Sequence, residues 1–196
     1  AEKLKAAAEA ELTQLSMKGA LLRISLEQAE DPQGFVEQGG TPRRLYPWGI
    51  DQVEFLFTAN PGEEPKPLSK IASGGELARV MLALKSILAE VDMTPILIFD
   101  EVDSGIGGRT AEVVGRKLES IARKRQVFCV THLPQIAAMA AHHHRIEKVS
   151  KRGRNITAMH TLTDETRLKE IARMSGGERV TKATLDHARE LLKNRS

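Results

Sequence analysis

The sequence contains little of what defines several large classes of protein. It has one cysteine, Cys129, so no disulfide can form within the chain, and we expect a reducing, cytoplasmic setting. No apolar run approaches the roughly 18 residues that a membrane-spanning helix needs, and no charged-then-apolar leader opens the chain. Aromatic residues make up 4%, which disfavours base stacking as a means of binding nucleic acid. We therefore expect a soluble protein with no membrane partner.

The sequence does contain enough apolar material for one core. Of its 196 residues, 41% are hydrophobic and 28% are charged, which predicts one main domain rather than disorder. The net charge of +3 permits contact with nucleotide or nucleic acid without requiring either. Residues 1–12 are strong helix formers, and no capping residue precedes them. We expect residues 1–20 to be the end of a longer connecting helix or coiled coil in a fragment, and residues 21–196 to be the domain.

Periodicity and turn residues predict a mixed α/β chain. In the first half we expect strands at residues 22–27 and 52–58, a Gly- and Pro-rich loop at 31–49 between them, and a helix ending near residue 91. In the second half, continuous apolar strands at 96–99 and 127–130 flank a helical stripe at 113–122. Continuous apolar runs of this kind are typical of strands buried on both faces of a sheet. The crossover should make the two strands parallel and usually adjacent, so that the residues after each strand emerge at the same edge. A hairpin around residues 151–154 and two short helices follow.

Two carboxylates, Asp100 and Glu101, come directly after the first of these parallel strands. Ligands of open α/β sheets bind at the carboxyl ends of strands, and alternation along a strand lets neighbouring side chains serve different purposes. Asp100 is therefore a candidate ligand for Mg²⁺, and Glu101 is a candidate for orienting or deprotonating an attacking water. The alternative is a strand that ends in solvated acids.

The segment Ser73-Gly74-Gly75-Glu76 opens the predicted helix of the first half. Serine at the cap with glutamate three residues later is a capping box, which gives a purely structural explanation. Adjacent glycines in a first helical turn are costly, however, and they suit a place where backbone amides approach a phosphate. A third feature, His132, follows the second parallel strand and should emerge beside Asp100 and Glu101, although a lone histidine is more often structural.

Taken in order, these segments resemble the motifs of an ABC-type ATPase head: a signature loop, a Walker B strand, a D-loop and a switch histidine. The matching stretches are Ala72 to Leu77, Ile96 to Glu101, Val102 to Gly108 and Val130 to Pro134. Asn60-Pro61-Gly62, Gly105 to Arg109 and Thr131 to Gln135 narrow the resemblance to the RecN family of bacterial DNA repair proteins, which are related to the SMC clamps. The resemblance covers nearly the whole chain from Leu22 onward.

The resemblance implies a fold, an activity and partners. The fold would be the C-terminal lobe of the ATPase head, a mostly parallel sheet flanked by helices. Residues 73–76 would contact the γ-phosphate of ATP held by a second head, Asp100 would serve Mg²⁺, Glu101 would be the catalytic carboxylate, and His132 would sense the γ-phosphate. Asp103, in the D-loop, would lie across the dimer interface. ATP hydrolysis by the head dimer would control the binding or tethering of DNA ends.

Two departures qualify the resemblance. Glu76 and Ala72 replace the Gln and Leu that are common in transporter signatures, which favours the SMC-like branch over a membrane transporter. The chain also contains no Gly-x-x-x-x-Gly-Lys-Ser/Thr loop to wrap the phosphates. In the family that loop belongs to an N-terminal lobe, so we expect this chain alone to be inactive. The alternatives are another SMC-type clamp, a transporter ATPase subunit, and a lobe that has lost catalysis and bridges partners.

Other conspicuous segments receive structural interpretations. Residues 175–178 repeat Ser-Gly-Gly-Glu but lack a following strand with terminal acids, so we expect a helix-capping box there. The run of histidines at 142–144 has no Cys or acidic partner at ligand spacing and is expected in a solvated loop. The basic clusters at 123–125 and 151–154 are candidates for DNA phosphate contacts, with solvated turns as the commoner explanation.

Overall fold

The computed structural model describes residues 1–151 and 154–194, in two compact units that divide between Ile87 and Leu88. Within the described residues, no helix is both long enough and apolar enough to cross a membrane.

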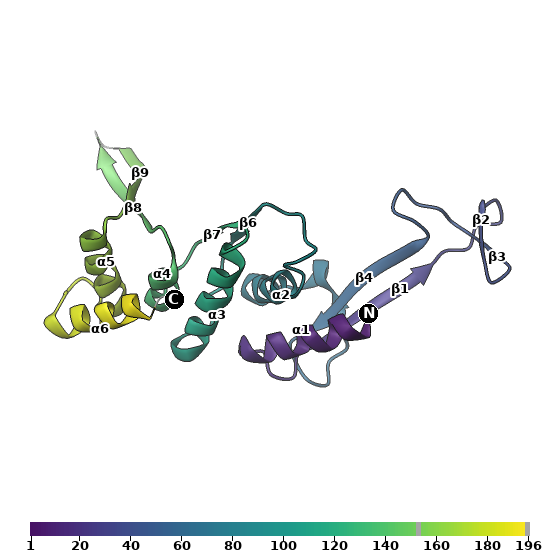
Figure 1. Cartoon of the computed structure of the whole chain (residues 1–196), viewed down its shortest axis with the longest axis horizontal. Coiled ribbons are helices and arrows are strands. Elements are labelled where there is room, and N and C mark those ends of the chain that lie inside the picture. Colours follow the sequence, from purple (N-terminus) through teal and green to yellow (C-terminus); the bar gives the residue numbers. More distant parts are fainter. Residues whose placement is uncertain (152–153, 195–196) are drawn as a thin grey trace. The chain divides into compact units, whose positions relative to one another are not determined.

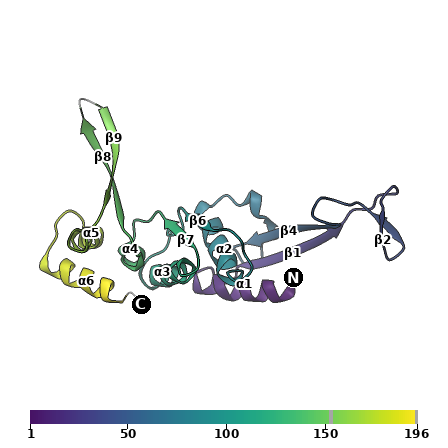
Figure 2. The ribbon, with the colours of Figure 1, turned by 45° about the horizontal axis from the view of Figure 1, so that its top comes forward.

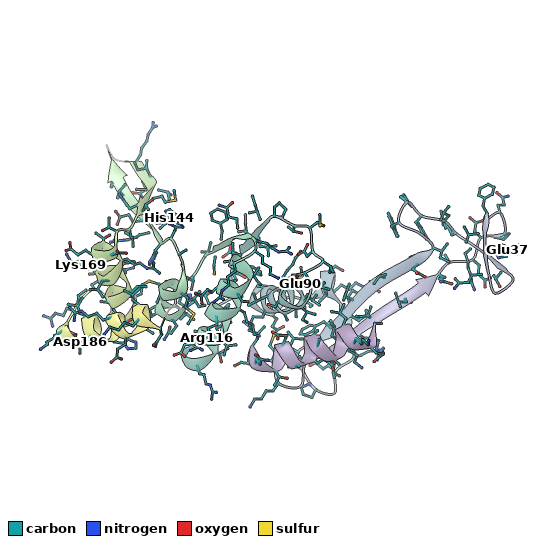
Figure 3. The ribbon with its side chains drawn as sticks, viewed as in Figure 1. Glu37, Glu90, Arg116, His144, Lys169 and Asp186 are labelled. Carbon is teal, nitrogen blue, oxygen red and sulfur yellow. The ribbon has the colours of Figure 1, made fainter. Side chains whose placement is uncertain are left out.

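A long antiparallel hairpin is the framework of the first unit (Figure 1). Strand β1 (Leu21–Gln28) pairs with β4 (Asp51–Thr58) along its whole length, and the short β5 (Lys66–Pro67) pairs with β4. Both predicted strands are thereby confirmed. The expected loop at 31–49 contains a second small hairpin, formed by β2 (Val36–Gln38) and β3 (Thr41–Arg43). Glu37 marks this small hairpin in Figure 3.

Two helices pack onto this framework. Helix α1 (Glu2–Gln14) contacts both β1 and α2 (Gly74–Ile87), and a short 3-10 helix, η1 (Leu68–Lys70), precedes α2. The buried side chains of the unit come from both helices and from the base of the hairpin: Ala8, Leu12, Leu15, Leu22, Phe57, Val80, Leu82 and Ala83. Helix α1 thus contributes to the core of this unit. That residues 1–20 are the end of a longer connecting helix or coiled coil stays a prediction.

The second unit contains the predicted strand, helix, strand segment. Strands β6 (Ile96–Phe99) and β7 (Gln126–Cys129) are parallel and adjacent, with helix α3 (Gly108–Ala122) as the crossover. Helix α3 buries one apolar stripe, as its spacing predicts: Ala111, Val114, Leu118 and Ile121. The parallel arrangement and the adjacency are therefore confirmed.

Burial of this strand pair on both faces is not observed. In β6, Leu97 and Phe99 are buried, whereas Ile96 is 49% exposed and Ile98 is 73% exposed. Phe128 and Val130 are exposed on the neighbouring strand. The expected mostly parallel sheet is represented by this one pair, since the other pairings of the described residues are antiparallel. Within the described residues, alternate apolar side chains of β6 therefore lack a cover.

The remainder of the second unit is a hairpin between helices (Figure 2). Short helix α4 (Pro134–Met139) leads to β8 (His144–Lys151) and β9 (Arg154–Thr161), which confirms the predicted hairpin; its predicted turn residues, Arg152 and Gly153, lie outside the described residues. Helices α5 (Asp164–Gly176) and α6 (Lys182–Lys193) follow. Figure 3 marks them with Lys169 and Asp186. They pack with α4 through Ala137, Ala138, Ile171, Ala172, Ala188 and Leu191.

The second Ser-Gly-Gly-Glu segment ends a helix instead of beginning one, so the capping-box prediction is wrong. Ser175 lies in the last turn of α5, where its Oγ donates to the Ile171 carbonyl at 2.8 Å. Gly177 then adopts a φ of 78°, a left-handed conformation that glycine accepts readily and that commonly ends helices. The capping box of α5 is formed instead by Thr163 and Thr166.

Candidate functional site

The carboxyl ends of β6 and β7 open at one edge, and this edge gathers most of the predicted site residues. The amide of Val130 donates to the Phe99 carbonyl at 2.9 Å, which continues the pairing to the ends of both strands. Asp100 and Glu101 leave one strand here, and Thr131 and His132 leave the other. The structure therefore brings together the acidic pair and the histidine, as the crossover predicts.

Glu101 occupies a strained position. Its φ of 58° lies in the left-handed region, which a residue with a Cβ rarely adopts. Such strain costs about 1–3 kcal/mol and concentrates at functional sites. The turn is held by the Asp100 carboxylate, whose Oδ1 accepts from the Glu101 amide at 2.9 Å, and by the Ser104 amide, which donates to the Glu101 carbonyl at 2.9 Å. Both acidic residues are exposed, so their side chains are accessible to a ligand.

Asp103 is engaged inside its own chain. Its Oδ2 accepts from the Thr131 hydroxyl at 2.6 Å and from the His132 amide at 2.9 Å, and it lies 3.0 Å from His132 Nδ1. The Asp103 side chain is 5% exposed, whereas the His132 side chain is 73% exposed. These contacts of the Asp103 carboxylate all lie within the chain. The position of Asp103 across a dimer interface stays a prediction. Thr131 was not predicted to be a residue of the site. Its position directly before His132 is the sequence feature that could have indicated it.

Cys129 lies beneath this edge as a neutral thiol. Burial raises its pKa to about 12, and the carboxylates of Asp103 and Asp100 add to the effect. A thiol with so high a pKa is a poor nucleophile at neutral pH.

The signature-like segment lies in the first unit, where it begins helix α2. Ser73 Oγ accepts from the Glu76 amide at 3.3 Å, and the Leu77 amide donates to the Ser73 carbonyl at 3.1 Å. Ser73 is thus the N-cap that the sequence predicts. A hydroxyl that accepts one hydrogen bond still has a hydrogen to donate. Capping and phosphate contact by the exposed Ser73 are therefore compatible, and so is an anion beside the exposed Gly74 at the positive end of the helix.

One charged residue of this helix falls outside the sequence-based prediction. Arg79 is buried within the apolar stripe of α2, and burial lowers its pKa, while the carboxylate of Glu76, one turn earlier, opposes that effect. Its position between Leu77 and Val80, two residues of the apolar stripe, is the sequence feature that could have predicted its burial.

The basic cluster at 123–125 is only partly available to DNA. Arg125 is 7% exposed and forms an ion pair with Asp92 at 3.0 Å. Its guanidinium also donates to the carbonyls of Ala89 at 2.5 Å, Asp92 at 2.6 Å and Thr94 at 3.1 Å. Lys124 pairs with Glu90. Two of the three cations thus have partners inside the protein, and Arg125 anchors the segment that leads into β6.

Metal-binding residues are sparse. The described part of the chain has no cluster of three or more His, Cys, Asp or Glu side chains that could hold an ion. In the histidine run, His143 is half-buried, which lowers its pKa, whereas the neighbouring His142 and His144 are exposed. A metal at Asp100 would consequently depend on oxygen ligands from elsewhere, such as nucleotide phosphates and water.

Proteins similar in sequence share one name. The chain is 43% identical over 192 residues to the DNA repair protein RecN of Streptomyces coelicolor, covering 98% of this chain and 33% of that protein. It is 49% identical over 154 residues to the DNA repair protein RecN of Bacillus subtilis, covering 79% of this chain and 27% of that protein. The chain therefore spans about a third of the length of the curated relatives it matches. No protein-family model matches it.

The solved structures that it resembles are SMC heads. The Smc head domain with a coiled coil and joint from Pyrococcus yayanosii matches with a TM-score of 0.56 at 19% identity, covering 89% of this chain and 29% of that one. At this identity the likeness concerns the fold, which is that of an SMC-type head.

Proposed function

We propose that this chain, which belongs to the RecN family and spans about a third of the length of its relatives, forms one lobe of an SMC-like ATPase head in a DNA repair protein. This chain would be the C-terminal lobe of the head. An N-terminal lobe, which carries the phosphate-wrapping loop, would complete the head. The relatives' name supports a role in DNA repair, and the head would act on DNA ends in the cytoplasm, at the nucleoid.

The observation that carries this proposal is the edge formed by β6 and β7. It presents Asp100, Glu101 and His132 together, and Glu101 stands in a backbone conformation that costs stability. A strained acidic residue at the carboxyl end of a parallel strand is expected where a ligand binds. The exposed Ile96 and Ile98 also support completion by another segment, because a β6–β7 pair with one open apolar face is not a finished sheet.

Each residue has a distinct role in this proposal. Asp100 offers carboxylate oxygens, which suit Mg²⁺. Bound magnesium would neutralise phosphate charge. The exposed Glu101 would orient the attacking water and accept its proton. His132 would present its exposed imidazole to the γ-phosphate, and the helix α2 start, with Ser73, would grip the γ-phosphate of ATP bound to a second head. Because the chemistry is mostly positioning and electrostatics, fixing these groups matters more than any covalent step.

The test is Glu101→Gln in the full-length protein. Removing a general base lowers turnover by roughly 10²- to 10⁴-fold, while the side-chain size and the ATP affinity should be preserved. Glu178→Gln is the matched control, because it alters the glutamate of the second, unrelated Ser-Gly-Gly-Glu segment. Unchanged steady-state hydrolysis in Glu101→Gln would remove Glu101 from the catalytic role.

The second candidate is a head lobe that bridges partners without hydrolysing ATP. The exposed apolar face of β6 is compatible with it, since a purely structural partner could also cover that face. The two candidates differ in the wild-type protein itself. A full-length protein that binds DNA and associates through its heads without ATP turnover would support the bridging role.

A further inference from the structure

We propose that Asp103 is a positioning residue that fixes the orientation and tautomer of His132. This proposal rests on the ATPase function proposed above, because it gives His132 the task of facing a phosphate. It assigns to Asp103 a role within its own head.

Three groups converge on one carboxylate oxygen of Asp103. The Thr131 hydroxyl, the His132 amide and His132 Nδ1 all lie within 3.0 Å of Asp103 Oδ2. A buried carboxylate is costly unless such donors compensate it. The loop after β6 and the segment after β7 are thereby joined at a single point, and Thr131 strengthens it by accepting from the Leu133 amide at 3.0 Å.

The Asp103 carboxylate also constrains the imidazole of His132. An ionised carboxylate accepts hydrogen bonds and cannot donate them, so the nitrogen beside it, Nδ1, must carry a proton in both charge states of the ring. Nε2 then points away from the buried carboxylate, on a side chain that is 73% exposed. A neutral His132 offers a lone pair there, and a protonated one offers an N–H to a phosphate oxygen. Asp103 thus selects which nitrogen is presented and holds the ring in place.

The two members of the pair differ in burial. The Asp103 side chain is 5% exposed, whereas the His132 side chain is 73% exposed. A buried carboxylate that supports an exposed imidazole is the arrangement expected where the ring has a ligand and its orientation matters. If the pair served only to close the loop, Thr131 and the His132 amide would suffice.

The experiment is a double-mutant cycle in the full-length protein, with ATP turnover as the readout. Loss of the carboxylate charge that faces the ring predicts that Asp103→Asn reduces turnover roughly 10- to 100-fold. In the His132→Ala background, Asp103→Asn should have no further effect, because Asp103 acts through the ring. Equal losses from Asp103→Asn in both backgrounds would overturn the proposal, and so would full turnover in Asp103→Asn beside a defective His132→Ala.

Two further measurements keep the test independent of folding and of the ATPase assignment. Thr131→Ser retains the hydroxyl and should keep wild-type turnover, whereas Thr131→Val should fall in the direction of Asp103→Asn. Nitrogen-15 NMR of histidine-labelled full-length protein, with His132→Ala as the assignment control, should show a protonated Nδ1 in wild type. A ring with its proton on Nε2 alone would overturn the proposal even if the protein hydrolysed no ATP, and wild-type inactivity with a protonated Nδ1 would overturn only the ATPase function.

Discussion

Arg125 offers the clearest separation of a structural role from DNA binding. Its guanidinium is almost fully buried, pairs with the Asp92 carboxylate, and donates to three carbonyl groups in the segment before β6. Arg125→Ala would remove all of these bonds at once and leave the part-buried Asp92 carboxylate without its cation, although Thr94 would still donate to it. Removing one partner of a buried ion pair costs about 3–5 kcal/mol. We therefore expect a loss of stability in the second unit on that scale.

The assay is denaturant unfolding of the full-length protein, with hydrogen exchange of residues 88–130 to localise the change. Arg125→Lys should recover only part of the loss, because one ammonium group cannot match the planar fork of arginine. Arg123→Ala is the control, since Arg123 is an exposed member of the same cluster. If Arg125→Ala leaves exchange unchanged and instead weakens DNA binding, the reasoning is refuted and the cluster is a DNA contact.

Two shorter predictions concern the other parts of the site. Ser73→Ala should lower ATP-driven head association and destabilise α2 by about 1 kcal/mol, the usual contribution of an N-cap residue. Ser175→Ala, in the second tetrapeptide, should leave head association intact. Equal effects of the two substitutions on association would refute the distinction. Cys129 should resist alkylation in the folded protein below about pH 11, because its pKa of about 12 keeps it protonated. Rapid alkylation of the folded protein at pH 8 would contradict a protonated Cys129. The free energy of unfolding should also fall as the pH rises from about 9 to about 12, since the thiol of the unfolded chain ionises first, near its ordinary pKa of 9.0.

The parts of the fold that could be predicted are those with a strong local signal. The strands β1, β4, β6 and β7 have apolar patterns and turn residues at their ends, and the crossover through α3 then determines that β6 and β7 are parallel. The three-residue strands β2 and β3 were missed because they are too short for a period, and Pro42 in β3 disfavours a strand. Helix α4, with six residues, has the same difficulty.

Long-range context explains the remaining differences. The tetrapeptide Ser-Gly-Gly-Glu begins a helix at residue 73 and ends one at residue 175, because Thr163 had already capped α5 upstream. The continuous apolar pattern of β6 suggests two buried faces, but a covering element is a property of the assembly and not of the strand. The contact between Asp103 and His132 joins loops 29 residues apart in sequence, so only the fold reveals it. The shared location of the acidic pair and the histidine at one edge was predictable, because the crossover determines which strand ends meet.

ATP hydrolysis by this chain alone, compared with hydrolysis by the full-length protein, tests the central claim most directly. The chain has an acidic pair and a signature-like helix start but no phosphate-wrapping loop. We predict turnover by the full-length protein and none by the chain. Turnover by the chain alone would contradict the account, because its nucleotide site would then have to be complete without a second lobe.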